Sequence, residues 1–200
     1  MTATRVESLS DEPVEVELIS AREDARRVCL GALEGEPRSA RSLVVRVGET
    51  FTTAVYAVGG QPTVFWNISH SAAVAAANEA LEAHATGEDA TFRIREVTHQ
   101  TVGRARLGLL RGSNCRVVAA SRIARAVITL AAEGGNVARA EQIRAATETL
   151  SETWAEDQIG GLPGGGVGAL LVGAAVLEAL VDAVGCREIT SRRARAASGS

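Results

Sequence analysis

Histidine and cysteine are the side chains of this sequence that could bind a transition metal or act as nucleophiles. These residues are His70, His84, His99, Cys29, Cys115 and Cys186. Neither set shows the short spacing, such as CxxC or HxxxH, from which zinc sites are built. We therefore predict no metal site. We expect ordinary polar histidines, and three buried free thiols of the kind found in a reducing compartment.

A glycine-rich segment at Gly160–Gly166 could in principle cradle a phosphate group. It precedes an apolar segment with the length of a helix. However, no strand leads into it and no Lys-Ser or Lys-Thr pair follows, both of which a Walker loop requires. All 21 basic residues are arginine, so no lysine is present to anchor a phosphate. We predict a flexible connection here.

Acidic side chains lie at the start of the first predicted helix. Ser20-Ala21-Arg22-Glu23 forms a capping box, in which the serine accepts a hydrogen bond from the Glu23 amide. Asp24 follows directly. From local physics alone, both acids complement the positive end of the helix dipole, which gives Asp24 a structural explanation alongside any catalytic one.

Composition limits the classes of protein to which the chain can belong. With 200 residues and 46% hydrophobic residues, it is long and apolar enough for one well-packed domain. Its net charge of −3 argues against binding to nucleic acid. The segment Met1–Val14 does not have the features of a secretory signal, and the apolar segment Val167–Val184 contains Glu178 and Asp182. We expect a cytoplasmic protein that does not bind membranes.

Hydrophobic periodicity and turn residues predict the elements that position these side chains. We predict strands at 14–18, 43–47, 51–58, 63–68, 92–97, 116–120 and around Ile189. We predict helices at 20–33, 72–84, 102–110, 121–132, 137–154 and 167–184. Residues 1–13 are predicted to be disordered, 14–191 to form a single domain, and 192–200 to be a flexible tail.

These elements predict an α/β fold. Its mixed five-stranded sheet contains an antiparallel three-strand meander and has helices on both faces. The order of elements resembles an actin-like (ribonuclease H-like) lobe.

Within that superfamily, two segments resemble the exopolyphosphatase/guanosine pentaphosphatase family. VELISAREDARRVCLGAL, at residues 16–33, is similar to the family's EVISGEEEARLAYLGAL. LVGAAVLEALVDAVGCREI, at residues 171–189, is similar to its AGALVLEALLEALGLDELVV. Residues 43–58 and 116–131 fall where the family has its two phosphate loops, VVDIGGGSTELVL and VVGTGGTARALA. The resemblance covers residues 14–192 and implies the family's second, C-terminal lobe without its N-terminal lobe.

The resemblance implies a role for a few residues. The family hydrolyses a terminal phosphoryl group with magnesium. Its water-positioning carboxylate corresponds to Asp24, one methylene shorter here. Gly48 and Thr52 fall in the first phosphate loop, and Arg122 falls in the second, where it could contact an anion. We therefore predict Asp24 as the candidate catalytic residue and Gly48, Thr52 and Arg122 as candidate phosphate contacts.

Most of the family's other functional residues are replaced. Arg46 fills the position of the metal-binding aspartate, and Thr53 that of the second metal carboxylate. The glycine triplet of the first loop becomes Gly48, Glu49 and Thr50. The second loop becomes the run Ala119, Ala120, Ser121, Arg122 and Ile123. Side chains at those positions obstruct the close approach of a phosphate to backbone amides.

Three hypotheses follow. We favour a catalytically degenerate lobe that acts as a protein-interaction or regulatory module, as a homodimer or in a hetero-oligomer with a complete family member. A second is a weak phosphohydrolase on polyphosphate or guanosine pentaphosphate, which would use magnesium. A third is a sensor that binds polyphosphate or a guanosine nucleotide without hydrolysis, with Arg46 replacing the charge of the metal.

Overall fold

The computed structural model describes residues 4–6, 14–16, 20–160 and 166–192. The main sheet has six strands in the order β5-β4-β3-β6-β8-β7. Their bounds are β3 (Arg41–Val47), β4 (Phe51–Val58), β5 (Gln61–Ser69), β6 (Arg116–Ala119), β7 (Val137–Arg139) and β8 (Glu188–Ser191). The helices are α1 (Ala21–Ala32), α2 (Ser71–Glu82), α3 (Gly87–Arg104), the 3-10 helix η1 (Leu107–Leu110), α4 (Arg122–Ala131), α5 (Ala140–Gly160) and α6 (Val167–Val184).

The sheet is mixed, as the sequence predicted. Strands β3, β4 and β5 form the antiparallel meander, whereas β3, β6 and β8 run parallel to one another. Two short strands, β1 (Thr4–Val6) and β2 (Val14–Val16), form a separate antiparallel pair. Strand β1 lies in the segment predicted to be disordered. The predicted strand at 14–18 is described only as far as Val16.

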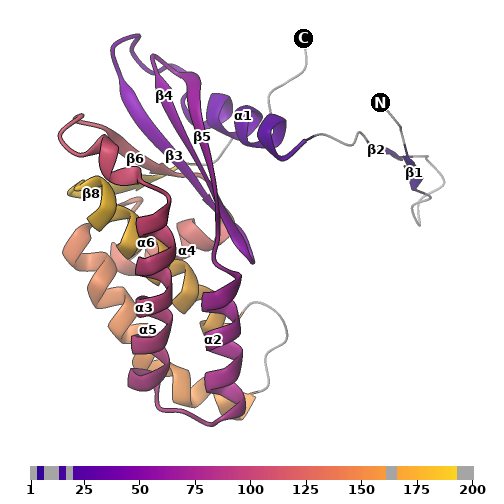
Figure 1. Cartoon of the computed structure of the whole chain (residues 1–200), viewed down its shortest axis with the longest axis vertical. Coiled ribbons are helices and arrows are strands. Elements are labelled where there is room, and N and C mark those ends of the chain that lie inside the picture. The colour runs from indigo at the N-terminus through magenta and orange to yellow at the C-terminus, as the bar shows by residue number, and fades with distance from the viewer. Residues whose placement is uncertain (1–3, 7–13, 17–19, 161–165, 193–200) are drawn as a thin grey trace.

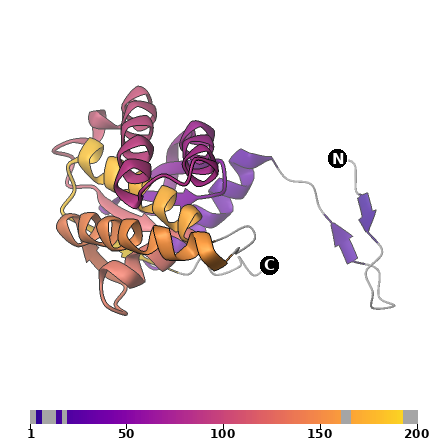
Figure 2. The same ribbon diagram turned by 90° about the horizontal axis from the view of Figure 1, so that it is seen from below.

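Helices cover both faces of the main sheet, which confirms the predicted α/β class. Among the described helices, α1 covers one face through a small core around Cys29, Val44 and Val55. The other helices form a layer on the opposite face, and the meander rises beyond that layer in Figure 1. Helix α6 lies in the middle of the layer in Figure 2, where it contacts α2, α3, α4 and α5. By length and composition α6 could cross a membrane, but 67% of it is buried inside the molecule.

Three of the predicted elements were wrong. Residues 92–97 lie inside α3, because the buried side chains there are Ala90, Ile94, Thr98 and Val102, which have helical spacing. The helix predicted at 102–110 is instead the end of α3 followed by η1. The helix predicted from Val137 begins at Ala140, because residues 137–139 form β7, the sixth strand, whose Ala138 pairs with Ile189 of β8.

The three cysteines are free thiols, as predicted. Cys29 and Cys115 are buried and Cys186 is half-buried. Burial raises the pKa of each thiol to about 11. At neutral pH these groups are therefore protonated and poor nucleophiles.

Candidate functional site

The candidate site lies at the end of the sheet where the parallel strands β3, β6 and β8 have their carboxyl ends side by side. Val45 of β3 pairs with Ala119 of β6, and Ala119 pairs with Ser191 of β8. In open α/β sheets, ligands bind beyond the carboxyl ends of the strands. The ion pair of Asp24 with Arg46 and the hydrogen bond of Ser121 with Val47 bring α1, the end of β3 and the start of α4 together at this end of the sheet.

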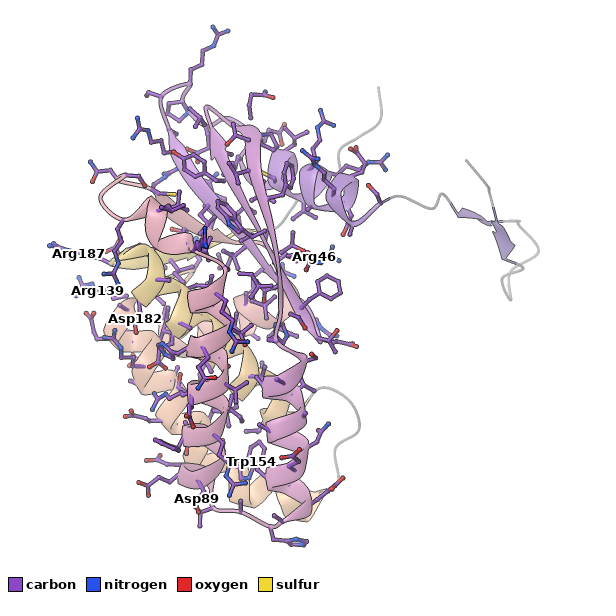
Figure 3. The ribbon with its side chains drawn as sticks, viewed as in Figure 1. Arg46, Asp89, Arg139, Trp154, Asp182 and Arg187 are labelled. Carbon is purple, nitrogen blue, oxygen red and sulfur yellow. The ribbon has the colours of Figure 1, made fainter. Side chains whose placement is uncertain are left out.

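Asp24 forms an ion pair with Arg46 of β3. Asp24 lies in the first turn of α1, which Ser20 caps as predicted by accepting a hydrogen bond from the Glu23 amide at 3.1 Å. The carboxylate of Glu23 pairs instead with Arg26 and Arg27. Figure 3 labels Arg46 beside the strands of the sheet, below α1 in this view. The carboxylate of Asp24, the candidate catalytic residue, and the guanidinium of Arg46 thus neutralise each other, with both side chains about half-exposed.

Gly48 shapes the turn between β3 and β4. Its N–H donates to the carbonyl oxygen of Phe51 at 3.0 Å, so this amide is already used within the turn. A Cβ atom on residue 48 would lie 2.9 Å from the same oxygen. The turn itself therefore requires glycine, and the presence of Gly48 does not by itself indicate a bound phosphate.

Thr52 is fully buried, and its hydroxyl is hydrogen-bonded to Nδ1 of His70 at 3.2 Å. The Thr52 side chain faces the interior, where it contacts His70. The sequence predicts an ordinary polar residue at His70, but its side chain is only 1% exposed. Its position directly before a predicted helix was the available signal, because its carbonyl oxygen accepts the first hydrogen bonds of α2.

Ser121 joins the ends of β3 and β6. Its hydroxyl oxygen accepts hydrogen bonds from the amide of Val47 at 3.1 Å and from the amide of Ala124 at 3.3 Å. It is therefore the N-cap of α4 and also a bridge to the first loop. The amides of Val47 and Ala124 are in this way both used internally.

Arg122, the third predicted phosphate contact, is exposed at the start of α4. It forms no ion pair within the described part of the chain. It lines a hollow of about 440 Å³ together with Arg125, Thr129, Asn136 and Ser191. The structure therefore places Arg122 on the flank of α4, among residues that sequence reasoning did not single out.

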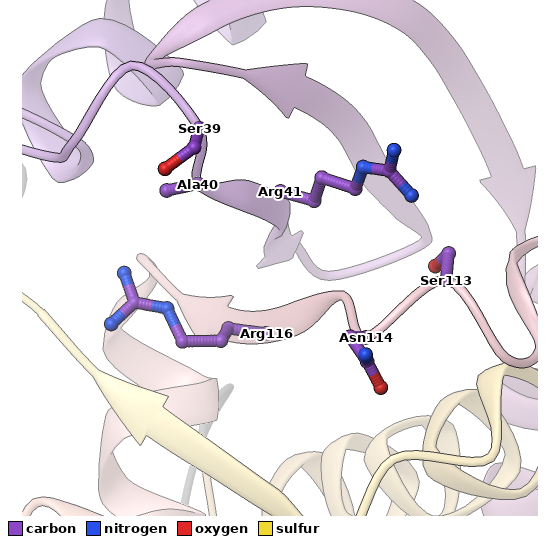
Figure 4. A pocket seen from close by; sticks show the side chains of 6 residues that line it. All are labelled: Ser39, Ala40, Arg41, Ser113, Asn114 and Arg116. Carbon is purple, nitrogen blue, oxygen red and sulfur yellow. The ribbon is translucent and has the colours of Figure 1, made fainter.

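A second hollow, of about 360 Å³, lies at the opposite end of the strands, near their amino ends, and is shown in Figure 4. It is lined by residues around the starts of β3 and β6. The two arginine side chains there, Arg41 and Arg116, point away from each other. Arg116 is also paired with the carboxylate of Glu36. The positive groups that line this hollow are therefore not directed at a common point.

One group in the described part of the chain has the composition of a metal site. Ligand-type atoms of His99, Glu178 and Asp182 lie within 4.8 Å of one another in the helix layer. However, guanidinium groups already bind both carboxylates: Arg95 donates to Glu178 at 3.1 Å, and Arg144 donates to Asp182 at 2.5 Å. Because arginines repel a divalent cation, we assign these acids to ion pairs.

The burial of His70 predicts a pH dependence of stability. Burial lowers the pKa of His70 below its ordinary value, and backbone hydrogen bonding toward Glu49 and Gly48 only partly opposes this. The unfolded chain then binds a proton at higher pH than the folded chain. The free energy of unfolding should fall below pH 6.5, by at most about 1.4 kcal/mol per pH unit from one group.

Urea denaturation between pH 7.5 and about pH 5, above the range in which most carboxylates titrate, measures this dependence. In His70→Gln the slope should be flatter than in the original protein, even if the variant is less stable overall. An equal slope in both proteins would show that another group carries the proton.

Comparison with known proteins agrees with the fold. No family model matches the sequence, and no curated protein matches it. Three solved structures superpose closely. An exopolyphosphatase-like protein gives a TM-score of 0.67 at 18% identity over 90% of this chain and 63% of that one. The Ppx/GppA enzyme of Aquifex aeolicus gives 0.66 at 13% identity over 86% and 60%. An exopolyphosphatase from Cytophaga hutchinsonii gives 0.61 at 11% identity over 90% and 62%.

The chain therefore has the fold of Ppx/GppA exopolyphosphatases, as the sequence resemblance predicted. It spans about 60% of the length of the Aquifex protein, so that protein's fold is matched only in part.

Proposed function

We propose that this chain, which has the Ppx/GppA exopolyphosphatase fold, is a catalytically silent lobe that acts as a protein-interaction or regulatory module. The observation that supports this most directly is the ion pair between Asp24 and Arg46. Phosphoryl transfer to water needs a carboxylate free to orient the water and carboxylates that hold magnesium. Here the candidate base is neutralised by a cation that stands at the metal position.

A magnesium ion does not fit the residues at the carboxyl ends of β3, β6 and β8. Arg46 and Thr53 replace the two carboxylates implied by the resemblance, and a guanidinium repels the ion. The Gly48 amide is used within the turn, and the Thr52 hydroxyl is hydrogen-bonded to His70. The Ser121 hydroxyl accepts from the Val47 amide. Loss of one catalytic electrostatic contact costs about 3 kcal/mol of transition-state stabilisation. The combined losses leave no route to efficient turnover.

An interaction role draws support from exposed apolar side chains of the meander, at both ends of β4 and on β5. Phe51, Val58 and Val64 are each 40 to 44% exposed. Strand β5, an edge of the sheet, carries no charged side chain. Exposed apolar edges of this kind are sites of protein association. The partner we propose is a second copy of the chain or a complete relative, in the cytoplasm, where the three thiols stay reduced.

Phosphate release tests the proposal. The purified chain, incubated with polyphosphate or guanosine pentaphosphate, should release no inorganic phosphate above background, with or without magnesium. Asp24→Asn should give the same result, because the carboxylate is already neutralised. Magnesium-dependent release that disappears in Asp24→Asn would overturn the proposal. Sedimentation velocity at micromolar concentration tests the interaction role, which a strict monomer with no co-purifying partner would contradict.

Arg122, exposed and without an ion pair among the described residues, favours a second candidate function, a sensor that binds an anion without hydrolysing it. In such a sensor Gly48, Thr52 and Arg122 contact polyphosphate or a guanosine nucleotide. The burial of Thr52 weighs against a direct contact from its side chain. A thermal shift with these ligands that is lost in Arg122→Gln supports the sensor, and no shift at millimolar ligand argues against it.

A further inference from the structure

The hollow on the flank of α4 brings polar side chains together from three parts of the chain. Arg122, Arg125 and Thr129 lie on successive turns of α4, Asn136 precedes β7, and Ser191 ends β8. The Ser191 amide donates to the Asn136 carbonyl oxygen at 2.7 Å, which fixes this side of the hollow. Among the described residues, no carboxylate and no aromatic ring lines it.

The two guanidinium groups are uncompensated. Within the described part of the chain, neither Arg122 nor Arg125 forms an ion pair. Arg125 donates from Nε to the Ser121 carbonyl oxygen at 3.4 Å, which orients its guanidinium and leaves its terminal nitrogens available. No acid among the described lining residues balances these two adjacent positive charges. Their charge favours an anion.

The volume of the hollow and the spacing of its two arginines indicate which class of anion it could bind. Side chains three apart on a helix are neighbours, with Cβ atoms about 5–6 Å apart. Two forked guanidinium groups can therefore each bind one of two linked phosphate groups through paired hydrogen bonds. A volume of about 440 Å³ is in the range of small-molecule sites and exceeds what a single phosphate fills.

We propose that this hollow is a binding site for a diphosphate group, held by Arg122 and Arg125 with Asn136, Thr129 and Ser191 as further polar contacts. The site goes beyond the proposed function, because it does not depend on catalytic silence or on a partner. It shares Arg122 with the sensor hypothesis but uses no group from the β3–β4 turn. The diphosphate can come from inorganic pyrophosphate or from a nucleoside diphosphate. Because no aromatic ring lines the hollow among the described residues, we expect the nucleoside base to add little to the binding affinity.

Isothermal titration of the full chain with pyrophosphate, and separately with guanosine diphosphate, tests the site. We expect both to bind with similar affinity, and binding should weaken as salt is raised. Arg125→Gln and Arg122→Gln should each weaken pyrophosphate binding about tenfold or more, since each removes a charge-assisted pair of hydrogen bonds. Arg93→Gln, at an exposed position of α3, is the matched control and should change affinity less than about twofold.

The outcomes separate this site from the other proposals. If Gln variants unfold, Arg125→Lys tests the same position while keeping the charge, and it should bind with intermediate affinity because it lacks the fork. No binding at millimolar pyrophosphate, or binding unchanged in both Gln variants, overturns the site while leaving the silent lobe intact. Phosphorus NMR after the titration should show intact pyrophosphate. Hydrolysis would contradict catalytic silence but not the site.

Discussion

Gly87→Ala should lower the free energy of unfolding by about 3 kcal/mol or more, the upper part of the range for overpacking. Gly87 is the first residue of α3, and α5 passes directly over it. A Cβ atom on residue 87 would lie 1.8 Å from the backbone carbonyl oxygen of Ser151. Because that oxygen belongs to the backbone of α5, no side-chain rotation can relieve the clash. The two helices would have to separate.

Gly103→Ala is the matched control, because Gly103 lies in the same helix and a Cβ atom on residue 103 would meet no described neighbour within 4 Å. Alanine is the better helix former, so this change should be neutral or stabilise the protein by up to about 1 kcal/mol. Urea denaturation of the two variants under identical conditions gives the comparison. Equal stabilities would mean that α3 and α5 are not closely packed at Gly87.

The close approach at Gly87 shows what sequence patterns predict well and what they miss. Strand β4 and helix α6 have the predicted bounds, because mainly apolar stretches and the glycines that flank them define them locally. Residues 92–97 alternate as a strand would, but Ile94 and Thr98 are buried with helical spacing against other helices. Residues 137–139 suit the start of a helix and become a strand only because β8 is free to pair with them. Both errors concern elements whose structure is decided by distant partners.

In the candidate site, too, contacts between near neighbours were predictable and contacts between distant residues were not. The cap at Ser20 and the turn at Gly48 were predictable, since capping and turn chemistry involve near neighbours. The ion pair between Asp24 and Arg46 joins residues 22 positions apart, and the contact of Thr52 with His70 joins residues 18 apart. Arg125, Asn136 and Ser191 meet only after β8 has paired beside β6. Such arrangements depend on the topology of the sheet, which no local pattern records.

Glu178→Ala should lower the free energy of unfolding by about 2–3 kcal/mol, below the range for a fully buried ion pair, because Arg95 is 27% exposed and keeps Glu148 as a partner. The Glu178 side chain is 9% exposed and accepts from Arg95 at 3.1 Å, with the Thr147 hydroxyl at 3.4 Å and Arg144 at 3.9 Å. Without the carboxylate, the Arg95 guanidinium loses its buried partner in the middle of the helix layer. Thermal and urea denaturation measure the loss.

Glu148→Ala provides the matched control, because Glu148 pairs with the same Arg95 at 3.5 Å but is 67% exposed. Removing an exposed partner should cost less than about 1 kcal/mol. If the two variants were equally stable, burial would not be what makes the Glu178 pair important. A large difference would show that burial makes the contact between Glu178 and Arg95 important for stability. At the sheet edge the same pairing of an acid with an arginine is exposed, and its effect there is to neutralise a candidate base rather than to hold the fold together.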